Sequence, residues 1–283
     1  MMMTFKSKSA SVFVPDTAFL PYAVKRTTAL CIAAHQDDVE LMAYAPIVEA
    51  YRKPDKWFTG AVVTDGAGSP RSGVYERYSD EDMKEVRSRE QNHAALLGDY
   101  AACIQLGFAS RDVKDAANPD VVADIKTIIE NCLPKVLYTH NLADKHDTHV
   151  AVALRVIAAC RLLPPEQRPE KIISCEVWRG LDWMRDSQKL VMDTSGHPGL
   201  SAALLGAFDS QIAGGKRYDL AAAGRRMANA TFFQSHDVDQ TDSVSFGVDI
   251  TELVNSDEKS ENFIGQYIDD FKMEVYNRIG GLS

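Results

Sequence analysis

Short apolar runs alternate with helical segments along the first 180 residues, and this order limits the fold more than any other feature of the chain. Within the runs, apolar and polar residues do not alternate, which is typical of strands buried on both faces of a sheet. We predict strands at residues 29–34, 58–64, 103–106, 136–139 and 171–178. We predict helices between them at residues 41–52, 80–97, 118–131 and 148–162. Strands and helices in this order form a parallel sheet with right-handed crossovers.

The sequence therefore predicts an α/β fold: a Rossmann-like, doubly wound and mainly parallel sheet with strand order 3-2-1-4-5, flanked by helices. Residues 1–27 are polar and aperiodic, and we expect them to lie across the surface. Further helices are predicted at residues 199–212, 218–230 and 261–278, with a short strand at 243–248. No clear linker divides the 283 residues, so we expect one domain, with a core at about 28–180 and a C-terminal helical elaboration at about 181–283.

Composition excludes several classes of protein. The net charge of −9 argues against nucleic acid or an anionic membrane as the main partner. The five cysteines are scattered without a CxxC pair, which indicates reduced thiols rather than disulfides or a zinc–thiolate site. No stretch approaches the roughly 20 apolar residues of a membrane span. We therefore expect a cytoplasmic protein without membrane insertion; its oligomeric state stays open, with a homo-oligomer as one alternative.

Two polar clusters follow strands that the predicted order makes neighbours. Residues 35–40 (HQDDVE) follow the first strand, and residues 146–149 (HDTH) follow the fourth. In a doubly wound sheet, ligands bind beyond the carboxyl ends of the strands, where the strand order reverses. The two clusters are therefore expected to meet at one site.

The residue types in these clusters suit a catalytic metal. His35, Asp38 and one histidine of the second cluster match the three protein ligands of a catalytic zinc, and Asp37 can accept a proton from the bound water. The remaining histidine can protonate a leaving amine or stabilise an oxyanion. Each residue also has an ordinary structural explanation, because lone histidines are commonly structural and an Asp-Asp pair often caps a helix. Their coincidence at one sheet edge favours the metal site.

Four motifs resemble the PIG-L/LmbE-like N-acetylglucosaminyl deacetylase family. Residues 34–40 (AHQDDVE) are similar to its A-H-P-D-D-x-E signature, and 63–68 to its T-x-G-x-x-G loop. Residues 87–98 are similar to its R-x-x-E-x-x-x-A-x-x-L-G helix, and 146–149 to its H-x-D-H motif. Order and spacing agree from about residue 29 to residue 160.

The resemblance implies a zinc-dependent hydrolase that removes acetyl groups from a small N-acetylated amino sugar or glycoconjugate. Carried over by position, His35, Asp38 and His149 would bind Zn²⁺ or another divalent transition metal. Asp37 would be the general base, and His146 the general acid or oxyanion stabiliser.

Two positions depart from the family pattern. Gln36 replaces a proline, which is expected to loosen the turn and add a side chain near the metal. Thr148 stands where the family has aspartate, and the acid falls at Asp147, so the usual carboxylate partner of His146 is displaced or lost, with Asp144 as the alternative partner. We expect Asp147 and His140 to support the site from behind.

Candidate substrate-binding residues come from three segments. Arg71 lies in a glycine-rich loop at residues 65–78, and Arg89 on the following helix. Trp178, Arg179 and Asp182 follow the fifth strand, and such a mixture suits the C–H patches and hydroxyls of a sugar. A mobile loop, a solvated arginine and a core tryptophan are the ordinary alternatives. Whether His236 approaches the site stays open.

Three other functions are alternatives to a sugar deacetylase. The departures leave room for a metal-dependent amidase or deacylase on a non-sugar conjugate. A metal-bearing carbohydrate-binding protein without turnover would not need Asp37. The sequence argues against a nucleotide-binding Rossmann protein, because acids stand where a pyrophosphate would bind.

Overall fold

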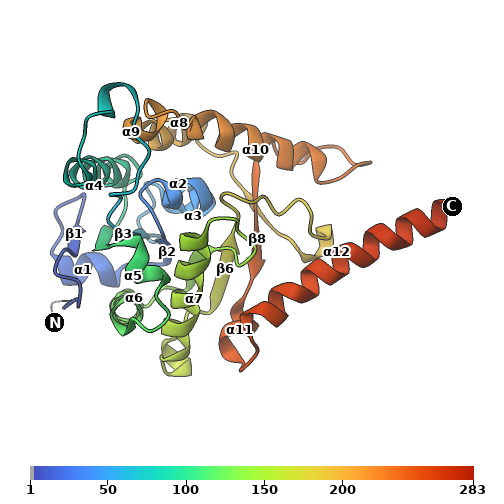
Figure 1. The fold of residues 1–283 in the computed structure, drawn as a ribbon, viewed down its shortest axis with the longest axis horizontal. Coiled ribbons are helices and arrows are strands. Elements are labelled where there is room, and N and C mark those ends of the chain that lie inside the picture. The colour runs from blue at the N-terminus through green and yellow to red at the C-terminus, as the bar shows by residue number, and fades with distance from the viewer. Residues whose placement is uncertain (1–2) are drawn as a thin grey trace.

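The computed structural model describes residues 3–283 and contains an eight-stranded mixed sheet with strand order β1-β4-β3-β2-β5-β6-β8-β7 (Figure 1). The strands are β1 (Ser11–Phe13), β2 (Ala29–Ala33), β3 (Phe58–Thr64), β4 (Ala102–Phe108), β5 (Val136–His140), β6 (Lys171–Cys175), β7 (Leu190–Asp193) and β8 (Val244–Asp249). The five central strands are parallel, in the order β4-β3-β2-β5-β6. The predicted order 3-2-1-4-5 is therefore confirmed, and strands β2 and β5 are neighbours.

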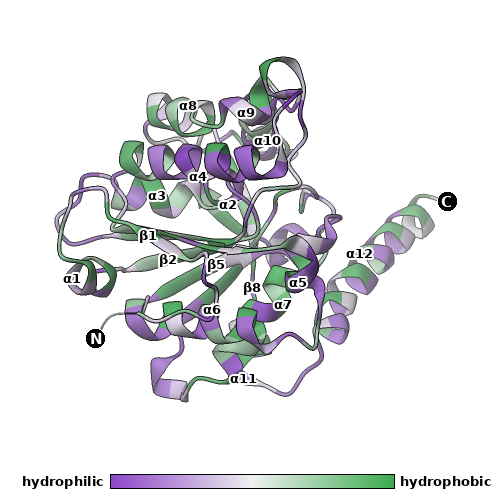
Figure 2. Cartoon of the chain, turned by 60° about the vertical axis from the view of Figure 1, so that its left-hand side comes forward, coloured by the Kyte–Doolittle hydropathy of each residue, from purple (hydrophilic) through white to green (hydrophobic). Residues whose placement is uncertain are grey.

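Helices cover both faces of this sheet (Figure 2). They are α1 (Leu20–Lys25), α2 (Asp38–Met42), α3 (Tyr44–Ala50), α4 (Asp80–Leu97), α5 (Ser110–Lys114), α6 (Pro119–Cys132), α7 (Asp147–Arg161), α8 (Pro198–Gly206), α9 (Asp209–Ile212), α10 (Tyr218–Phe232), α11 (Thr251–Asn255) and α12 (Ser260–Leu282). Helices α6, α7 and α11 pack on one face, and α2, α3, α4 and α8 on the other. The helices differ from the prediction mainly where one predicted helix corresponds to two helices in the structure.

Two of the predicted helices are divided. The segment predicted at 41–52 forms α2 and α3, which meet at Ala43. Pro46 lies in the first turn of α3, where its missing N–H needs no partner, so the proline is accommodated by starting a new helix. The segment predicted at 199–212 breaks at Ala207–Phe208 into α8 and α9.

The outer strands of the sheet are antiparallel. β1 pairs with β4, Ser11 opposite Gln105, so the prediction that residues 1–27 only lie across the surface is wrong for residues 11–13 and 20–25. At the other edge β8 pairs with β6 and β7 pairs with β8. The predicted strand at 243–248 is confirmed, and the C-terminal part of the chain contributes strands as well as helices. Three or four edge residues give too weak a pattern to predict β1 and β7.

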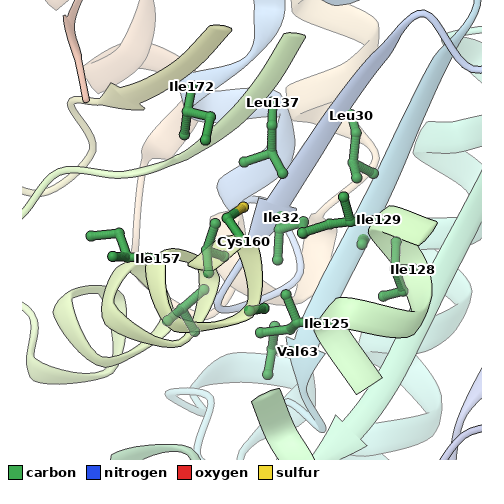
Figure 3. Packing of buried hydrophobic residues seen from close by; sticks show 14 of the residues in the cluster. Leu30, Ile32, Val63, Ile125, Ile128, Ile129, Leu137, Ile157, Cys160 and Ile172 are labelled. Atoms are coloured by element: carbon green, nitrogen blue, oxygen red, sulfur yellow. The ribbon is translucent and has the colours of Figure 1, made fainter. Parts of the chain in front are cut away.

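The core on the α6/α7 face is formed by aliphatic side chains from β2, β3, β5 and β6 that interlock with both helices. Figure 3 labels Leu30, Ile32, Val63, Leu137 and Ile172 from the strands, and Ile125, Ile128, Ile129, Ile157 and Cys160 from the helices. All of them are almost completely buried. This packing holds β2 and β5 rigidly side by side, so the loops that leave their carboxyl ends are fixed relative to one another.

Of the 23 residues of helix α12, only Phe263 is buried. It extends away from the sheet at the C-terminal end of the chain (Figure 1). Among residues 3–283, no helix is both long enough and apolar enough to span a bilayer.

Buried residues of α7 should contribute more to the free energy of unfolding than exposed residues of the same helix. Ile157 is 3% exposed and Leu154, on the same helix, is 37% exposed. We expect Ile157→Ala to lower the free energy of unfolding by about 2–5 kcal/mol, because it leaves a cavity that the packed core cannot fill. Leu154→Ala should cost about 1 kcal/mol or less. Urea unfolding measures both, and equal losses would contradict the packing described.

Candidate active site

The loop after β2 turns sharply at Asp37, whose φ of 91° is unusual for a residue other than glycine. Arg87 of α4 holds this conformation, because its Nη2 donates to the Gln36 carbonyl and, over 2.8 Å, to Asp37 Oδ2. The Gln91 amide oxygen accepts from the Asp37 N–H at 3.2 Å. Helix α2 then begins at Asp38. The turn therefore presents Asp37 and Asp38 from consecutive positions, braced by one face of α4.

Gln36 does not extend toward this site. Its side chain is buried, and its amide donates to the Thr64 carbonyl at 3.2 Å and to Gln105 Oε1 at 3.3 Å. Gly66 leaves room for it, because a Cβ there would lie 2.7 Å from Gln36 Oε1. The expectation that Gln36 loosens the turn and lies near the metal is wrong: it ties the turn to strands β3 and β4.

His35, Asp38 and His149 each place one atom that can bind a metal ion at the corner of a compact triangle. His35 Nδ1 lies 3.0 Å from Asp38 Oδ2 and 3.2 Å from His149 Nε2, and these last two atoms are 3.2 Å apart. Ligand atoms of a tetrahedral zinc with bonds of about 2.0–2.1 Å lie about 3.3 Å from one another. Two imidazole nitrogens and one carboxylate oxygen are also a common donor set for a catalytic zinc. The three residues fit a metal ion in both spacing and chemistry.

His140 and His146 also lie close to this triangle. With them, two overlapping sets of three residues could bind a metal ion: His35, His146 and His149, or Asp38, His140 and His149. The Nε2 of His140 is already occupied, because it accepts from the Ala34 N–H at 2.8 Å. His146 Nδ1 accepts from the Thr148 N–H at 3.3 Å, which leaves its other nitrogen free. His149 lies between the two rings, with centroids 4.0 Å from His140 and 4.5 Å from His146.

Charge holds this cluster together. Burial alone would lower the pKa of His149, but Asp38 and Asp144 outweigh it and raise the pKa to about 9. Burial raises the pKa of Asp38, and the neighbouring His149, His35 and His140 reverse this and hold it well below its usual range. A buried cluster of carboxylates and imidazoles thus requires a positive charge at its centre, which either a proton or a divalent ion can supply.

Asp144 supports His149 from behind, and Asp147 does not. Asp144 Oδ2 lies 3.5 Å from His149 Nδ1, and its two oxygens accept from the N–H groups of His146 and Trp178, each at 3.0 Å. Asp147 is exposed at the start of α7. The prediction for Asp147 is wrong because the first residue of the helix points outward. Asp144, the alternative partner for His146, accepts only from the backbone N–H of that residue and faces the imidazole of His149 instead.

A cleft of about 310 Å³ opens onto the triangle. Its walls contain Asp37, Arg87, His146, Trp178 and Tyr218, among others. Burial raises the pKa of Asp37 to about 6, against the opposing effect of Arg87. Of the predicted residues, the cleft brings together His35, Asp37, Asp38, His146 and Trp178.

Four predicted substrate-binding residues lie outside the cleft. Arg89 is exposed, two positions from the buried Arg87 and therefore about 200° around the helix from it. Arg71 pairs with Asp80 instead. Arg179 and Asp182 are exposed. His236, whose approach to the site the sequence leaves open, is also exposed and does not line the cleft.

The sequence reasoning missed residues from the C-terminal part of the chain. Gln211, Lys216 and Tyr218 line the cleft from α9 and the start of α10. Hydrogen bonds position this segment, including Ser210 Oγ to Glu90 Oε2 at 2.7 Å and Tyr75 OH to Asp209 Oδ2 at 2.7 Å. The basic residues before the helix at 218–230 were visible in the sequence, but nothing there indicated which strand ends they would face.

Comparisons with known proteins agree with this site. Residues 30–160 match the PIG-L family, described as GlcNAc-PI de-N-acetylase. Over 156 residues the chain is 31% identical to the uncharacterized deacetylase YaiS of Escherichia coli K12, an alignment that covers 53% of this chain and 77% of YaiS. This chain belongs to the PIG-L family of deacetylases. The family resemblance of the motifs is thereby confirmed, and membership supports an enzyme that acts on acetylated substrates.

Solved structures share the fold. The N,N'-diacetylchitobiose deacetylase of Pyrococcus horikoshii superimposes with a TM-score of 0.65 at 14% identity, over 83% of this chain and 88% of that one. The 4-carboxy-2-hydroxymuconate hydratase GalB of Pseudomonas putida KT2440 superimposes with a TM-score of 0.59 at 15% identity, over 79% of this chain and 96% of that one. Because one neighbour is a deacetylase and the other a hydratase, the reaction must be argued from the site rather than from the fold.

The bracing role of Arg87 distinguishes it sharply from Arg89. Removing the buried guanidinium leaves the Asp37 and Glu90 carboxylates without their partner, so Arg87→Met should lower the free energy of unfolding by about 3–5 kcal/mol. Arg89→Met, at the exposed position, should change it by about 0.5 kcal/mol or less. Chemical denaturation compares the two variants, and a similar small effect in both would contradict the bracing.

Proposed function

We propose that the protein is a metal-dependent hydrolase that removes the acetyl group from an N-acetylated amino sugar or a conjugate of one. The observation that carries the proposal is the triangle of His35, Asp38 and His149 with Asp37 beside it, at the floor of an open cleft. Membership of the PIG-L family supports acetylated substrates. We propose zinc as the ion, with another divalent transition metal as the alternative.

The proposed reaction exchanges an amide C–N bond for a C–O bond. When bound, the ion would supply Lewis acidity, which lowers the pKa of a water molecule and polarises the amide carbonyl. Asp37 would accept a proton from the attacking water and return it to the departing amine nitrogen. Arg87 holds one Asp37 oxygen at 2.8 Å, and the other has no hydrogen-bond partner within residues 3–283, so it is free to do this.

His146 can serve the same reaction by donating to the carbonyl oxygen as negative charge develops on it. Because its Nδ1 accepts from the Thr148 N–H, the neutral imidazole carries its proton on Nε2. That proton is available as a fixed donor in the cleft, and such donors are worth about 10²–10³ in rate. The hydrogen bond from Thr148 supports this oxyanion role over a role as proton donor to the amine.

Trp178 would present an aromatic wall to the sugar ring. It is half-buried and lies in the cleft, and its backbone N–H donates to Asp144. The C–H face of a pyranose packs on such a ring, and the same cleft is lined by the polar side chains of Asp37, Asp38 and His35. An aromatic ring beside polar groups supports a sugar over a purely aliphatic amide.

Acetate release from the methyl glycoside of N-acetylglucosamine tests the proposal. We expect release that stops on chelation and returns with Zn²⁺, and a loss of about 10²–10⁴-fold in kcat for Asp37→Asn, because that variant lacks the base. The variant should keep its metal, measured by equilibrium dialysis. A parallel assay with N-acetylated amino acids distinguishes a sugar deacetylase from an amidase of another class. Full activity without any metal would refute the proposal.

The supporting carboxylate gives a matched pair of variants. Asp144→Asn should weaken Zn²⁺ binding about 10–100-fold, because the residue behind a ligating histidine sets its orientation and basicity. Asp147→Asn, three residues along and exposed, should leave the affinity unchanged. Competition with a chromophoric chelator measures both, and equal affinities would remove Asp144 from the site.

A further inference from the structure

The C-terminal helix α12 continues beyond its contacts with the rest of the protein. Trp183 packs edge-on against Phe271, with ring centroids 6.2 Å apart, and Arg185 Nη2 donates to the Asp270 carbonyl at 2.9 Å. Among residues 3–283, no hydrogen bond, ion pair or aromatic contact joins residues 275–282 to another element. The last turns of the helix therefore extend into solvent (Figure 1).

These last turns have little stability of their own as a helix. Most helical stability in proteins comes from the packing of an apolar face, and the end of a helix without such packing is marginal. Gly280 and Gly281 lie in this end, and glycine is the least favourable residue in a helix interior apart from proline. The helical conformation of residues 275–282 therefore indicates a packing partner.

An apolar stripe runs along α12 and provides the surface for such a partner. Its members recur three or four positions apart: Ile264, Ile268, Phe271, Val275, Ile279 and Leu282. Ile268 is 49% exposed, Ile279 60% and Leu282 87%, and Figure 2 shows hydrophobic residues along the helix. Apolar residues at this spacing are typical of a helix that packs lengthwise on a second helix.

The charges of α12 argue against a lipid surface as the partner. The helix carries more acidic than basic side chains: Glu261, Asp269, Asp270 and Glu274 against Lys272 and Arg278. Helices that lie on membranes typically have a polar face rich in lysine and arginine, which anionic headgroups attract. The net charge of −9 on the whole chain opposes the same contact. A protein surface is therefore favoured.

The charge pattern beside the stripe is complementary to itself. Glu274 and Arg278 lie one turn apart on one edge of the stripe and pair at 2.7 Å. When two identical helices pack antiparallel around a two-fold axis, this edge of one helix faces the same edge of the other. With the axis at residue 276, Glu274 of each copy would face Arg278 of the other. A parallel pair would bring unlike edges together and lose both contacts.

The same register aligns the apolar side chains. At 1.5 Å per residue, Val275 of one copy would lie between Val275 and Ile279 of the other. Leu282 of one copy would lie between Ile268 and Phe271 of the other. Side chains placed in this way form the knobs-into-holes packing of a coiled coil. The charges and the apolar stripe thus fit one arrangement.

We propose that α12 is a dimerisation helix, whose apolar stripe packs antiparallel on α12 of a second copy of this chain. The contact is confined to one helix from each copy. We therefore expect a reversible dimer with a dissociation constant on the order of micromolar. No residue of α12 lines the active-site cleft, so the proposal does not depend on the proposed function.

Sedimentation velocity of the full chain across the micromolar range tests the proposal. We expect the mass to rise from monomer to dimer with concentration. Ile279→Glu should raise the dissociation constant of the dimer about tenfold or more, because association would bury an unpaired carboxylate. Met273→Glu is the matched control, because Met273 is 48% exposed and lies about 200° around the helix from Val275. A monomer at every concentration, or equal effects of the two variants, would overturn the proposal.

Charge reversal distinguishes a second copy from any other protein partner. Glu274→Arg alone, or Arg278→Glu alone, places like charges opposite one another and should weaken the dimer about tenfold. A mixture of the two variants restores opposite charges at both contacts, so the mixed dimer should form about as tightly as the wild-type dimer. Circular dichroism checks that each variant keeps its helix content. No recovery in the mixture would contradict the antiparallel pairing.

A vesicle assay covers the lipid alternative. The full chain is mixed with vesicles of phosphatidylcholine, with and without phosphatidylserine, and separated by flotation. We expect the protein to stay unbound in both cases. Binding that Ile279→Glu abolishes would assign the stripe to a lipid surface and overturn the proposal.

Discussion

The burial of Asp38 among three imidazoles is the interaction on which the site depends. A carboxylate this deeply placed is stable only with positive charge or hydrogen-bond donors around it. The imidazole and the backbone N–H of His35 come from the same loop as Asp38. His149 lies in the segment after β5, and His140 is the last residue of β5. The buried Asp38 carboxylate is therefore stabilised because β2 and β5 are neighbours, and the core against α6 and α7 holds these two strands together.

Around this centre the chain places two further layers of support. Arg87 holds Asp37 in a backbone conformation that few residues adopt, and Asp144 lies behind His149 while anchoring the backbone of Trp178. Each support reaches a second element as well as a site residue. The residues of the cluster are thus held by more than one element, as a preorganised site requires.

The C-terminal part of the chain completes the cleft rather than merely covering it. Helices α9 and α10 supply Gln211 and Tyr218, and the segment between them supplies Lys216. The family match ends at residue 160, before this region begins. The PIG-L motifs and the wall of the cleft formed by α9 and α10 therefore lie in different parts of the sequence.

The sequence alone determined the parallel sheet, its strand order and the meeting of residues 35–40 with residues 146–149, because buried strands and helices have strong periodic patterns and topology rules leave few arrangements. It did not determine which of two nearby residues in the chain faces the site. Arg87 faces it rather than Arg89 because of the rotation of α4 about its axis. Asp144 faces it rather than Asp147 because α7 begins at Asp147. The contribution of α10 was decided by tertiary structure alone, since contacts between residues far apart in the chain leave no local pattern to read.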